Sequence, residues 1–238
     1  MAQDLAGRSV VVTGGTGALG SAVVERALGS GATVWVPCFH LREMESFGLK
    51  DAGSVRLVPG VDLRAEASVE GFFEEVSRSG ARVWASIHVA GGFAMGPITE
   101  TSAETMMQQF TLNALSVMLC AREAVKRMRA GGDGGRIVNV SALAGGRDAV
   151  GGMSAYTTAK GAVATFTRCL AEEVRGDGIL VNAVVPGVMD TPANRRAMPD
   201  ADPGRWARVA DVADAMWWLA SPANAVVSGA VVPVQGRG

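Results

Sequence analysis

Tyr156 and Lys160 are the two residues of this chain whose types and spacing could do acid–base chemistry. A phenol has an ordinary pKa of about 10, so it is a poor acid or base near neutrality. An ammonium one helical turn away favours the phenolate and lowers the pKa of the phenol towards neutral pH. Residues four apart lie on one face of a helix, which permits this pairing. Tyr156 is the only tyrosine in the chain, so no other phenol competes for the role.

A glycine-rich run near the N-terminus could hold a dinucleotide. It reads Thr13-Gly14-Gly15-Thr16-Gly17-Ala18-Leu19-Gly20 and lies between a predicted strand, 8–13, and a predicted helix, 17–28. Glycines let a backbone turn sharply and approach a pyrophosphate, whose negative charge meets the helix N-terminus. Together the two motifs favour nucleotide-dependent catalysis over a surface Tyr–Lys pair and a plain strand–helix connection.

The elements that must position these residues alternate along the whole chain. Apolar runs predict strands at 8–13, 33–36, 55–59, 83–89, 136–140, 179–184 and 230–234. Helical patterns lie at 17–28, 65–77, 103–129, 154–174 and 209–219. This alternation predicts the α/β class: a Rossmann-type, doubly wound parallel sheet of seven strands with helices on both faces, in one domain over 1–238. The segment 189–206 is interpreted as one irregular excursion beyond the sixth strand, where such sheets bind ligands.

Composition limits the partners and the location. A net charge of −1 gives no basic field for nucleic acid or anionic lipid. The longest apolar runs have the length of strands and not of membrane spans, and we expect no signal peptide. Three scattered cysteines, Cys38, Cys120 and Cys169, suit a reducing compartment and predict a cytoplasmic protein. Two histidines, His40 and His88, are too few for an ordinary zinc site, so we expect no metal.

On these motifs the chain resembles the short-chain dehydrogenase/reductase family over essentially its whole length. The TGxxxGxG loop of that family matches at Thr13, Gly14 and Gly20, with Ala18 in place of the middle glycine. The resemblance implies cofactor contacts from Gly14, Thr16, Gly17, Leu19, Gly20, Cys38, His40, Asp62, Leu63, Ala90, Gly91, Tyr156, Lys160, Pro186, Gly187, Val188 and Thr191.

The resemblance also implies a catalytic set of Asn113, Ser141, Tyr156 and Lys160. Asn113 matches the asparagine of the family's proton relay, whereas Val89 replaces the asparagine of its NAG turn. The serine that usually binds the substrate oxygen aligns with Ala142, and Ser141 lies one residue early. Two alternatives stay open: a register shift brings Ser141 into that role, or Ser141 makes only packing and turn hydrogen bonds.

Within the family, the chain resembles dihydropteridine reductase and its bacterial relatives. The matching stretches are 13–20, 89–93 and 190–202. Those reductases also work without the usual serine. The likeness implies hydride transfer between a nicotinamide and a carbonyl, an alcohol or a pterin-like conjugated imine of a small metabolite.

The end of the second predicted strand bears on the choice of nicotinamide cofactor. An acid there would bind the ribose 2′-hydroxyl and select NAD, but the equivalent position is Cys38. His40 and Arg42 could meet a 2′-phosphate or could be solvated loop residues; of the two cofactors, NADP is favoured over NAD. Apolar residues on the loops at the carboxyl edge would form a wall for the substrate. They are Phe93, Met95, Met153, Met189 and Trp206.

A second hypothesis is a dinucleotide-binding or sensor protein that has lost catalysis. Ala18, Val89 and Ala142 favour it, whereas the intact trio of Asn113, Tyr156 and Lys160 opposes it. An epimerase or dehydratase has no support beyond the fold.

Assembly is predicted from apolar residues in excess of what one core needs. The helical patterns at 103–129 and 154–174 carry apolar side chains around much of their circumference. Trp217 and Trp218 are adjacent on one helix and cannot both face one core. We therefore expect at least a homodimer, and favour a homotetramer.

Overall fold

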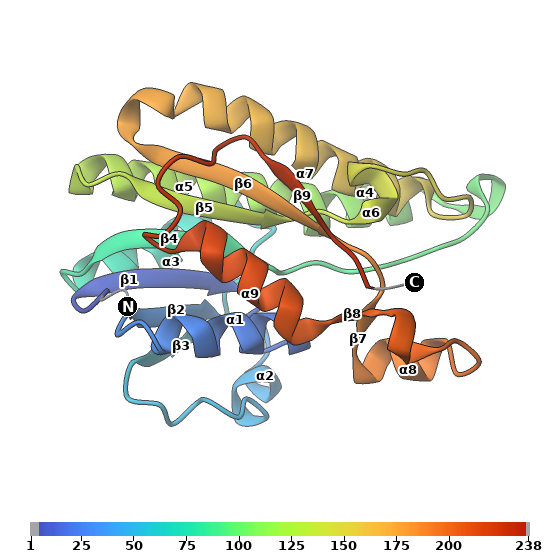
Figure 1. Ribbon diagram of the computed structural model, residues 1–238, viewed down its shortest axis with the longest axis horizontal. Helices are drawn as coiled ribbons and strands as arrows, with labels where there is room; N and C mark the ends of the chain where they lie inside the picture. The colour runs from blue at the N-terminus through green and yellow to red at the C-terminus, as the bar shows by residue number, and fades with distance from the viewer. Residues whose placement is uncertain (1–4, 237–238) are drawn as a thin grey trace.

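A parallel sheet of seven strands runs through the middle of the computed structural model, which describes residues 5–236 (Figure 1). The strand order is β3-β2-β1-β4-β5-β6-β9. The strands are β1 Arg8–Thr13, β2 Thr33–Pro37, β3 Val55–Val58, β4 Arg82–His88, β5 Gly135–Val140, β6 Ile179–Pro186 and β9 Val231–Val234. The predicted Rossmann-type fold is confirmed. The winding reverses between β1 and β4, so a crevice opens at the carboxyl ends of these two strands.

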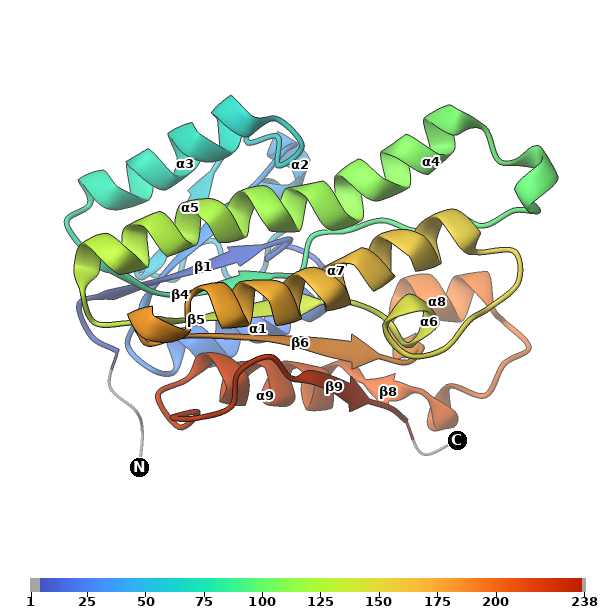
Figure 2. The same cartoon turned by 90° about the horizontal axis from the view of Figure 1, so that it is seen from above.

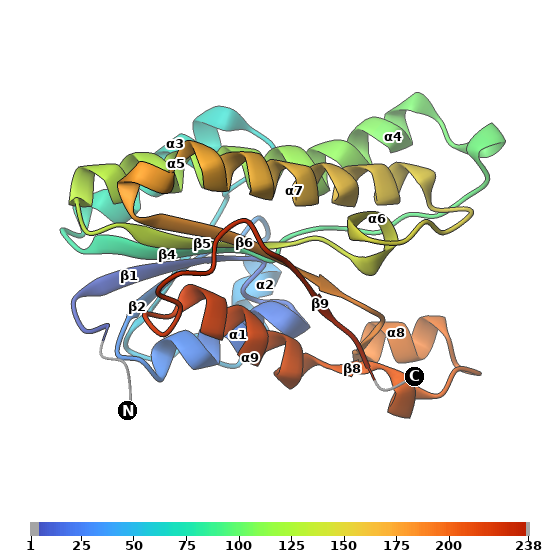
Figure 3. The ribbon, with the colours of Figure 1, turned by 45° about the horizontal axis from the view of Figure 1, so that its top comes forward.

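Helices cover both faces of the sheet. Figure 3 shows α1 and α9 on one face and α3, α5 and α7 on the other. The helices are α1 Ala18–Leu28, α3 Glu66–Arg78, α4 Ala103–Phe110, α5 Ser116–Gly131, α7 Ser154–Glu173 and α9 Val209–Ala220. Seen from above, α4 continues into α5 and runs beside α7 (Figure 2).

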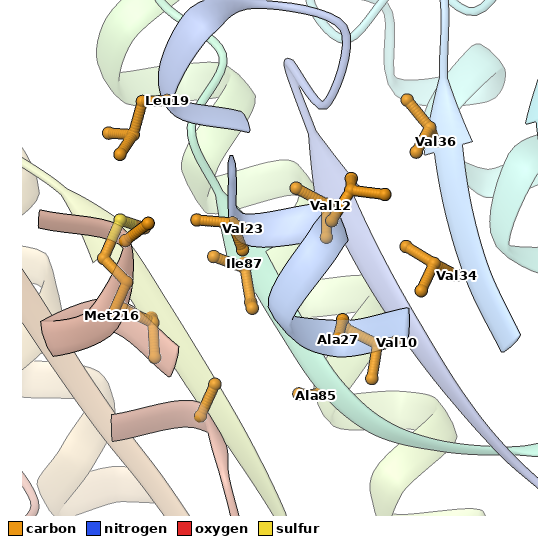
Figure 4. Packing of buried hydrophobic residues seen from close by; sticks show 14 of the residues in the cluster. Val10, Val12, Leu19, Val23, Ala27, Val34, Val36, Ala85, Ile87 and Met216 are labelled. Atoms are coloured by element: carbon orange, nitrogen blue, oxygen red, sulfur yellow. The ribbon is translucent and has the colours of Figure 1, made fainter. Parts of the chain in front are cut away.

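The core explains why the strands are apolar on both sides. Val10 and Val12 of β1 pack with Val23 and Met216 in the cluster beneath α1 and α9 (Figure 4). Val11, which points the other way, joins the cluster beneath α3 and α5. Successive strand residues face opposite sides, so a sheet covered twice needs continuous apolar runs.

The structure corrects two predicted elements. The helix expected at 103–129 is interrupted by a π-helical turn, Thr111–Leu115, and ends at Gly131. The segment 189–206 is not one irregular excursion: it contains the short strand β7 Met189–Asp190, which pairs with β8 Ala207–Arg208, and the helix α8 Pro192–Ala197. The α8 helix begins there because the Thr191 hydroxyl accepts the Asn194 N–H, at 3.1 Å.

One of the two adjacent tryptophans is exposed, and the last strand lies at the edge of the sheet, as the sequence predicted. Trp217 is half-buried against the core, whereas Trp218 is 47% exposed. β9 ends the sheet, and its side chains are half-buried or exposed. Among residues 5–236, no helix has the length and apolar character needed to cross a membrane.

Candidate active site

The glycine loop packs too tightly for side chains at two of its glycines. Gly14 has a φ of +64°, and a Cβ there would lie 2.8 Å from the backbone nitrogen of Ala90. A Cβ at Gly20 would lie 2.0 Å from the carbonyl oxygen of Gly14. The Gly17 N–H donates to that same carbonyl, at 3.0 Å, and closes the turn. The loop thus brings β1 and the start of α1 against the turn after β4.

The N-terminus of α1 fits a pyrophosphate. Gly17 caps the helix without a side-chain hydrogen bond, and no acid lies in the first turn. The first amide groups of a helix have no partner within it, so they remain for an anion. Ala18, at the first helical position, is exposed. The residues present fit a dinucleotide, with less room at Ala18 than a glycine would leave.

Lys160 is a buried cation at the centre of the site. It is 4% exposed, and its Nζ donates to the carbonyl oxygen of Val140, at 2.9 Å. Burial disfavours the charged form and lowers the pKa of Lys160 to about 8. A Cβ at Gly91 would lie 3.4 Å from this Nζ, so α7 and the turn after β4 meet here.

Tyr156 lies one turn before Lys160 on α7, as predicted. The Lys160 Nζ is 5.9 Å from the centroid of its ring. Burial raises the pKa of Tyr156. The expectation that Lys160 lowers this pKa is therefore wrong in its direction for the protein alone, because removing the phenol from water has the larger effect.

The Ser141 hydroxyl is used inside the fold. Ser141 is 1% exposed, and its Oγ donates to the carbonyl oxygen of Lys160, at 2.7 Å. This geometry is the packing alternative of the two left open by the sequence. Ala142 follows it at the end of β5 and carries no hydrogen-bonding side chain. The side chains at this strand end thus offer no hydroxyl that is free of a protein partner.

Asn113 lies in the π-helical turn between α4 and α5. Its Nδ2 donates to the carbonyl oxygens of Gly92 and Gln109, each at 3.0 Å. Its Oδ1 accepts the Gly92 N–H, at 3.1 Å. Asn113 therefore holds the turn after β4 through both backbone groups of Gly92. One lone pair of Oδ1 is left over, since an amide oxygen has two.

The apolar wall predicted from the loops forms only in part. Phe93 packs on Tyr156 with ring centroids 5.0 Å apart and ring planes at 79°. Met95 and Met153 line a neighbouring recess of about 210 Å³ together with Glu100 and Thr105. Met189, in contrast, packs against the core beneath α1 and α9.

An arginine and an acid form an ion pair in the region where the adenosine end of the cofactor is expected. Cys38 is fully buried, and its pKa is raised to about 11, mainly by burial, so it offers no anion near neutral pH. Arg64, which the sequence reasoning missed, lies over the Phe39 ring at 5.2 Å and grips both oxygens of Asp62, at 2.8 and 2.9 Å. This ion pair holds the pKa of Asp62 below its usual range.

The residues expected at the nicotinamide lie on the segment that follows β6. Pro186 ends the strand, and the Gly187 N–H donates to the carbonyl oxygen of Val234, at 3.1 Å. Val188 is exposed towards solvent, whereas the Thr191 hydroxyl caps α8. The remaining expected cofactor residues differ in burial: Leu19 lies in the core, Thr16 and Leu63 are half-buried, and His40 is exposed.

A buried polar chain supports the site from within the sheet, and the sequence reasoning missed it. His88 Nδ1 donates to Asn139 Oδ1, at 2.8 Å, and His88 Nε2 accepts from the Ser86 hydroxyl, at 2.8 Å. Asn139 Nδ2 continues the chain to the Thr167 hydroxyl on α7, at 2.9 Å. Burial lowers the pKa of His88 to about 4, so the ring is neutral. These hydrogen bonds link β4 to β5 and β5 to α7. They lie directly before Val89, the residue that replaces the asparagine of the NAG turn.

His88 is a structural residue, because both of its ring nitrogens are hydrogen-bonded inside the sheet. Over residues 5–236, no group of three or more histidine, cysteine or acidic residues is placed to hold a metal ion.

Several known proteins similar to this chain are named dehydrogenases. The family model described as short chain dehydrogenase matches residues 8–202. The chain is 34% identical to a cis-4-hydroxycyclohexanecarboxylate dehydrogenase from Sinomonas cyclohexanicum, covering 99% of this chain and 98% of that protein. It is 31% identical to a 2,5-dichloro-2,5-cyclohexadiene-1,4-diol dehydrogenase from Sphingobium indicum, covering 98% of this chain and 97% of that protein.

A solved structure supports the same grouping. A short-chain type dehydrogenase/reductase from Mycobacterium ulcerans superposes with a TM-score of 0.89 at 25% identity, covering 98% of this chain and 90% of that chain. With the glycine loop, the Tyr156–Lys160 pair and the doubly wound sheet in place, the chain belongs to the short-chain dehydrogenase family and is an NAD(P)-dependent oxidoreductase.

Proposed function

We propose that this enzyme interconverts a ring alcohol and the corresponding ring ketone, with NADP as the preferred cofactor. The observation that carries the proposal is the buried Lys160 ammonium, held by the Val140 carbonyl one turn from the only tyrosine. The names of two relatives, a hydroxycyclohexanecarboxylate dehydrogenase and a cyclohexadiene-diol dehydrogenase, support a cyclic substrate.

The chain's own residues supply the proton and the orientation. When bound, the nicotinamide gives or takes the hydride. The Tyr156 hydroxyl donates a proton to the substrate oxygen during reduction and accepts it during oxidation. Lys160, with a pKa of about 8, is mostly protonated at neutral pH and favours the phenolate as the proton leaves. Its two remaining N–H bonds are free for the nicotinamide ribose and a water. The free lone pair of Asn113 Oδ1 accepts from that water and so links Lys160 to solvent.

We further propose that Ser141 takes no direct part in substrate binding. Its hydroxyl is committed to the Lys160 carbonyl, where it fixes α7 against β5. Tyr156 is then the only protein hydroxyl that the proposal assigns to the substrate oxygen.

The preference for NADP rests on the residues at the adenosine end. No carboxylate ends β2, and the Cys38 thiol is buried and neutral. Two exposed arginines lie nearby instead: Arg42 follows His40 in the next helical turn, and Arg64 lies over the Phe39 ring while it pairs with Asp62. A 2′-phosphate would meet positive charge there, whereas a 2′-hydroxyl would find no acceptor at residue 38.

An assay of nicotinamide absorbance tests the activity. We expect NADPH-dependent reduction of cyclohexanone carboxylates, and NADP-dependent oxidation of cyclic diols, in the wild type. Tyr156→Phe should lose nearly all turnover and keep its affinity for NADPH, because only the hydroxyl is removed. Val226→Ala, at an exposed site near the amino end of the sheet, is the control and should match the wild type. Equal turnover in Tyr156→Phe would refute the assignment.

The same assay decides between the remaining alternatives. Turnover of a quinonoid pterin alone would favour the pterin-like imine that the sequence suggested. NADPH binding without turnover of any ketone, diol or pterin would favour the sensor hypothesis.

We also propose that the enzyme is a cytoplasmic homotetramer. All three cysteines are free thiols, which suits a reducing compartment. Exposed Met106 and Met107 on α4, together with exposed Trp218 on α9, leave apolar surface for other subunits.

A further inference from the structure

Phe93 is a large aromatic side chain that is mostly exposed although it contacts another aromatic ring. Its ring packs edge-to-face on Tyr156, with centroids 5.0 Å apart, yet the residue is 58% exposed. One part of the ring thus contacts the reacting phenol, and the rest faces open space beside it. Met95, two residues on, is 68% exposed on the same loop. The loop therefore presents uncovered apolar surface beside Tyr156.

The backbone before Phe93 is fixed closely against the helix that carries Asn113. Both backbone groups of Gly92 bond to the Asn113 amide, at 3.0 and 3.1 Å. A Cβ at Gly92 would lie 2.6 Å from Leu112 Cδ2, and one at Gly91 would lie 2.7 Å from Asn113 Oδ1. This close contact excludes larger residues and determines where the Phe93 side chain starts. Phe93 is therefore held over Tyr156 by the fold, although its ring is exposed.

Hydrogen bonding from the end of β5 cannot orient the substrate. The Ser141 hydroxyl is buried and donates to the Lys160 carbonyl, at 2.7 Å. Ala142, the next residue, has only a methyl group. A substrate oxygen bonded to Tyr156 alone can still rotate about that one bond. A second contact is needed to fix the angle at which the substrate faces the nicotinamide.

We infer that Phe93 supplies this second contact, by packing on the apolar ring of the substrate and orienting its carbonyl towards Tyr156. This inference rests on the proposed activity and names the residue that recognises the ring of its substrate. An open-chain ketone of equal size has no ring face to pack on Phe93, so the contact stabilises its bound state less. Aromatic and apolar ring contacts are worth enough to alter rates about tenfold.

Matched substrates and variants of the whole enzyme test the inference. Cyclohexanone and an open-chain six-carbon ketone are compared as substrates for the wild type, Phe93→Leu, Phe93→Ala and the control Val226→Ala. We expect Phe93→Ala to lower kcat/KM about tenfold for cyclohexanone and less than about twofold for the open-chain ketone. Phe93→Leu should fall between, since leucine keeps apolar contact without the ring. Equal losses for both ketones would overturn the inference.

A spectroscopic measurement checks that Phe93 contacts Tyr156 in solution. Because the chain has one tyrosine, the near-ultraviolet absorbance change with pH reports the ionisation of Tyr156 alone. Burial raises the pKa of Tyr156, so removing the Phe93 ring should lower it. An unchanged titration in Phe93→Ala would show that the two rings do not meet, and would overturn the inference even if activity fell.

Failure of the proposed activity gives a different result. If the wild type reduces neither ketone, the activity is wrong, and calorimetric binding of both ketones to the NADP complex then tests Phe93. Preferential loss of cyclohexanone binding in Phe93→Ala would support its role, and equal binding by all variants would refute it.

Discussion

Replacing Lys160 with methionine should make the fold more stable at neutral pH while it removes activity. The ammonium is almost fully buried, and burial lowers its pKa from 10.5 to about 8. At about 1.4 kcal/mol for each pH unit, the charged form destabilises the folded state by about 3 kcal/mol. Methionine has a similar length and no charge. It loses the hydrogen bond to the Val140 carbonyl, a loss of about 1–2 kcal/mol. The net expected gain at pH 7 is about 1–2 kcal/mol.

The pH dependence gives this prediction a sign that can be checked. Below about pH 8, Lys160 is protonated in both states and the full penalty applies. Between pH 8 and 10.5 the unfolded chain binds more protons than the folded one, so wild-type stability gains from rising pH. Lys160→Met has no such group. The stability advantage of Lys160→Met over the wild type should therefore shrink between pH 8 and 10.5. It should reverse near pH 10, where the main remaining difference is the hydrogen bond that Lys160→Met has lost.

Urea unfolding of both proteins from pH 6 to about pH 10 measures the difference. Other groups that titrate in this range, such as the buried thiols of Cys38 and Cys120, are common to both proteins and cancel. Lys50→Met is a matched control, because Lys50 is exposed and also donates to a backbone carbonyl, that of Glu45. Lys50→Met should change the free energy of unfolding by less than about 0.5 kcal/mol, because its side chain is exposed. A pH-independent difference for Lys160→Met would refute the reasoning, since it would mean that the ammonium is not desolvated.

Three further predictions concern the cofactor loop, the buried polar chain and assembly. Gly20→Ala should abolish NADP binding or unfold the protein, because its Cβ would lie 2.0 Å from the Gly14 carbonyl oxygen. Ala18→Gly should tighten NADP binding several-fold. Calorimetry measures both affinities, and unchanged affinities would contradict the loop geometry. The free energy of unfolding of the wild type should fall by about 3 kcal/mol through His88 as pH drops from 6.5 to about 4, because the unfolded chain protonates this histidine first. His88→Leu should be less stable at pH 7 and should lack this loss of stability in acid. Identical acid profiles of the two proteins would refute the role of His88. Light scattering after size exclusion should give a tetramer mass, and a clean monomer would contradict the proposed assembly.

Much of the fold could be predicted because its signals are local. Strands such as β1 are apolar at successive positions since both faces of the sheet are covered, and that run is visible in the sequence. The glycines of the phosphate loop and the four-residue spacing of Tyr156 and Lys160 are also local, so their elements follow from backbone geometry. The positions of these motifs in chain order then place them at the carboxyl ends of β1 and β5.

Contacts between distant segments could not be predicted in the same way. Whether Ser141 or Ala142 faces the substrate depends on how the end of β5 meets α7, and the bond from Ser141 to the Lys160 carbonyl joins residues 19 apart. The pairing of His88 with Asn139 depends on β4 and β5 being neighbours in register. No periodicity in either segment encodes that adjacency.

The electrostatics of the site likewise depended on the tertiary structure. Sequence spacing put an ammonium near a phenol and suggested a lowered pKa for Tyr156. In the structure the phenol of Tyr156 is half-buried and the ammonium of Lys160 is almost fully buried, and burial raises the pKa of Tyr156 and lowers the pKa of Lys160. Spacing along a helix determines which side chains are neighbours. The amount of water left around them is set by segments far away in the chain, and that decides which charged forms are stable.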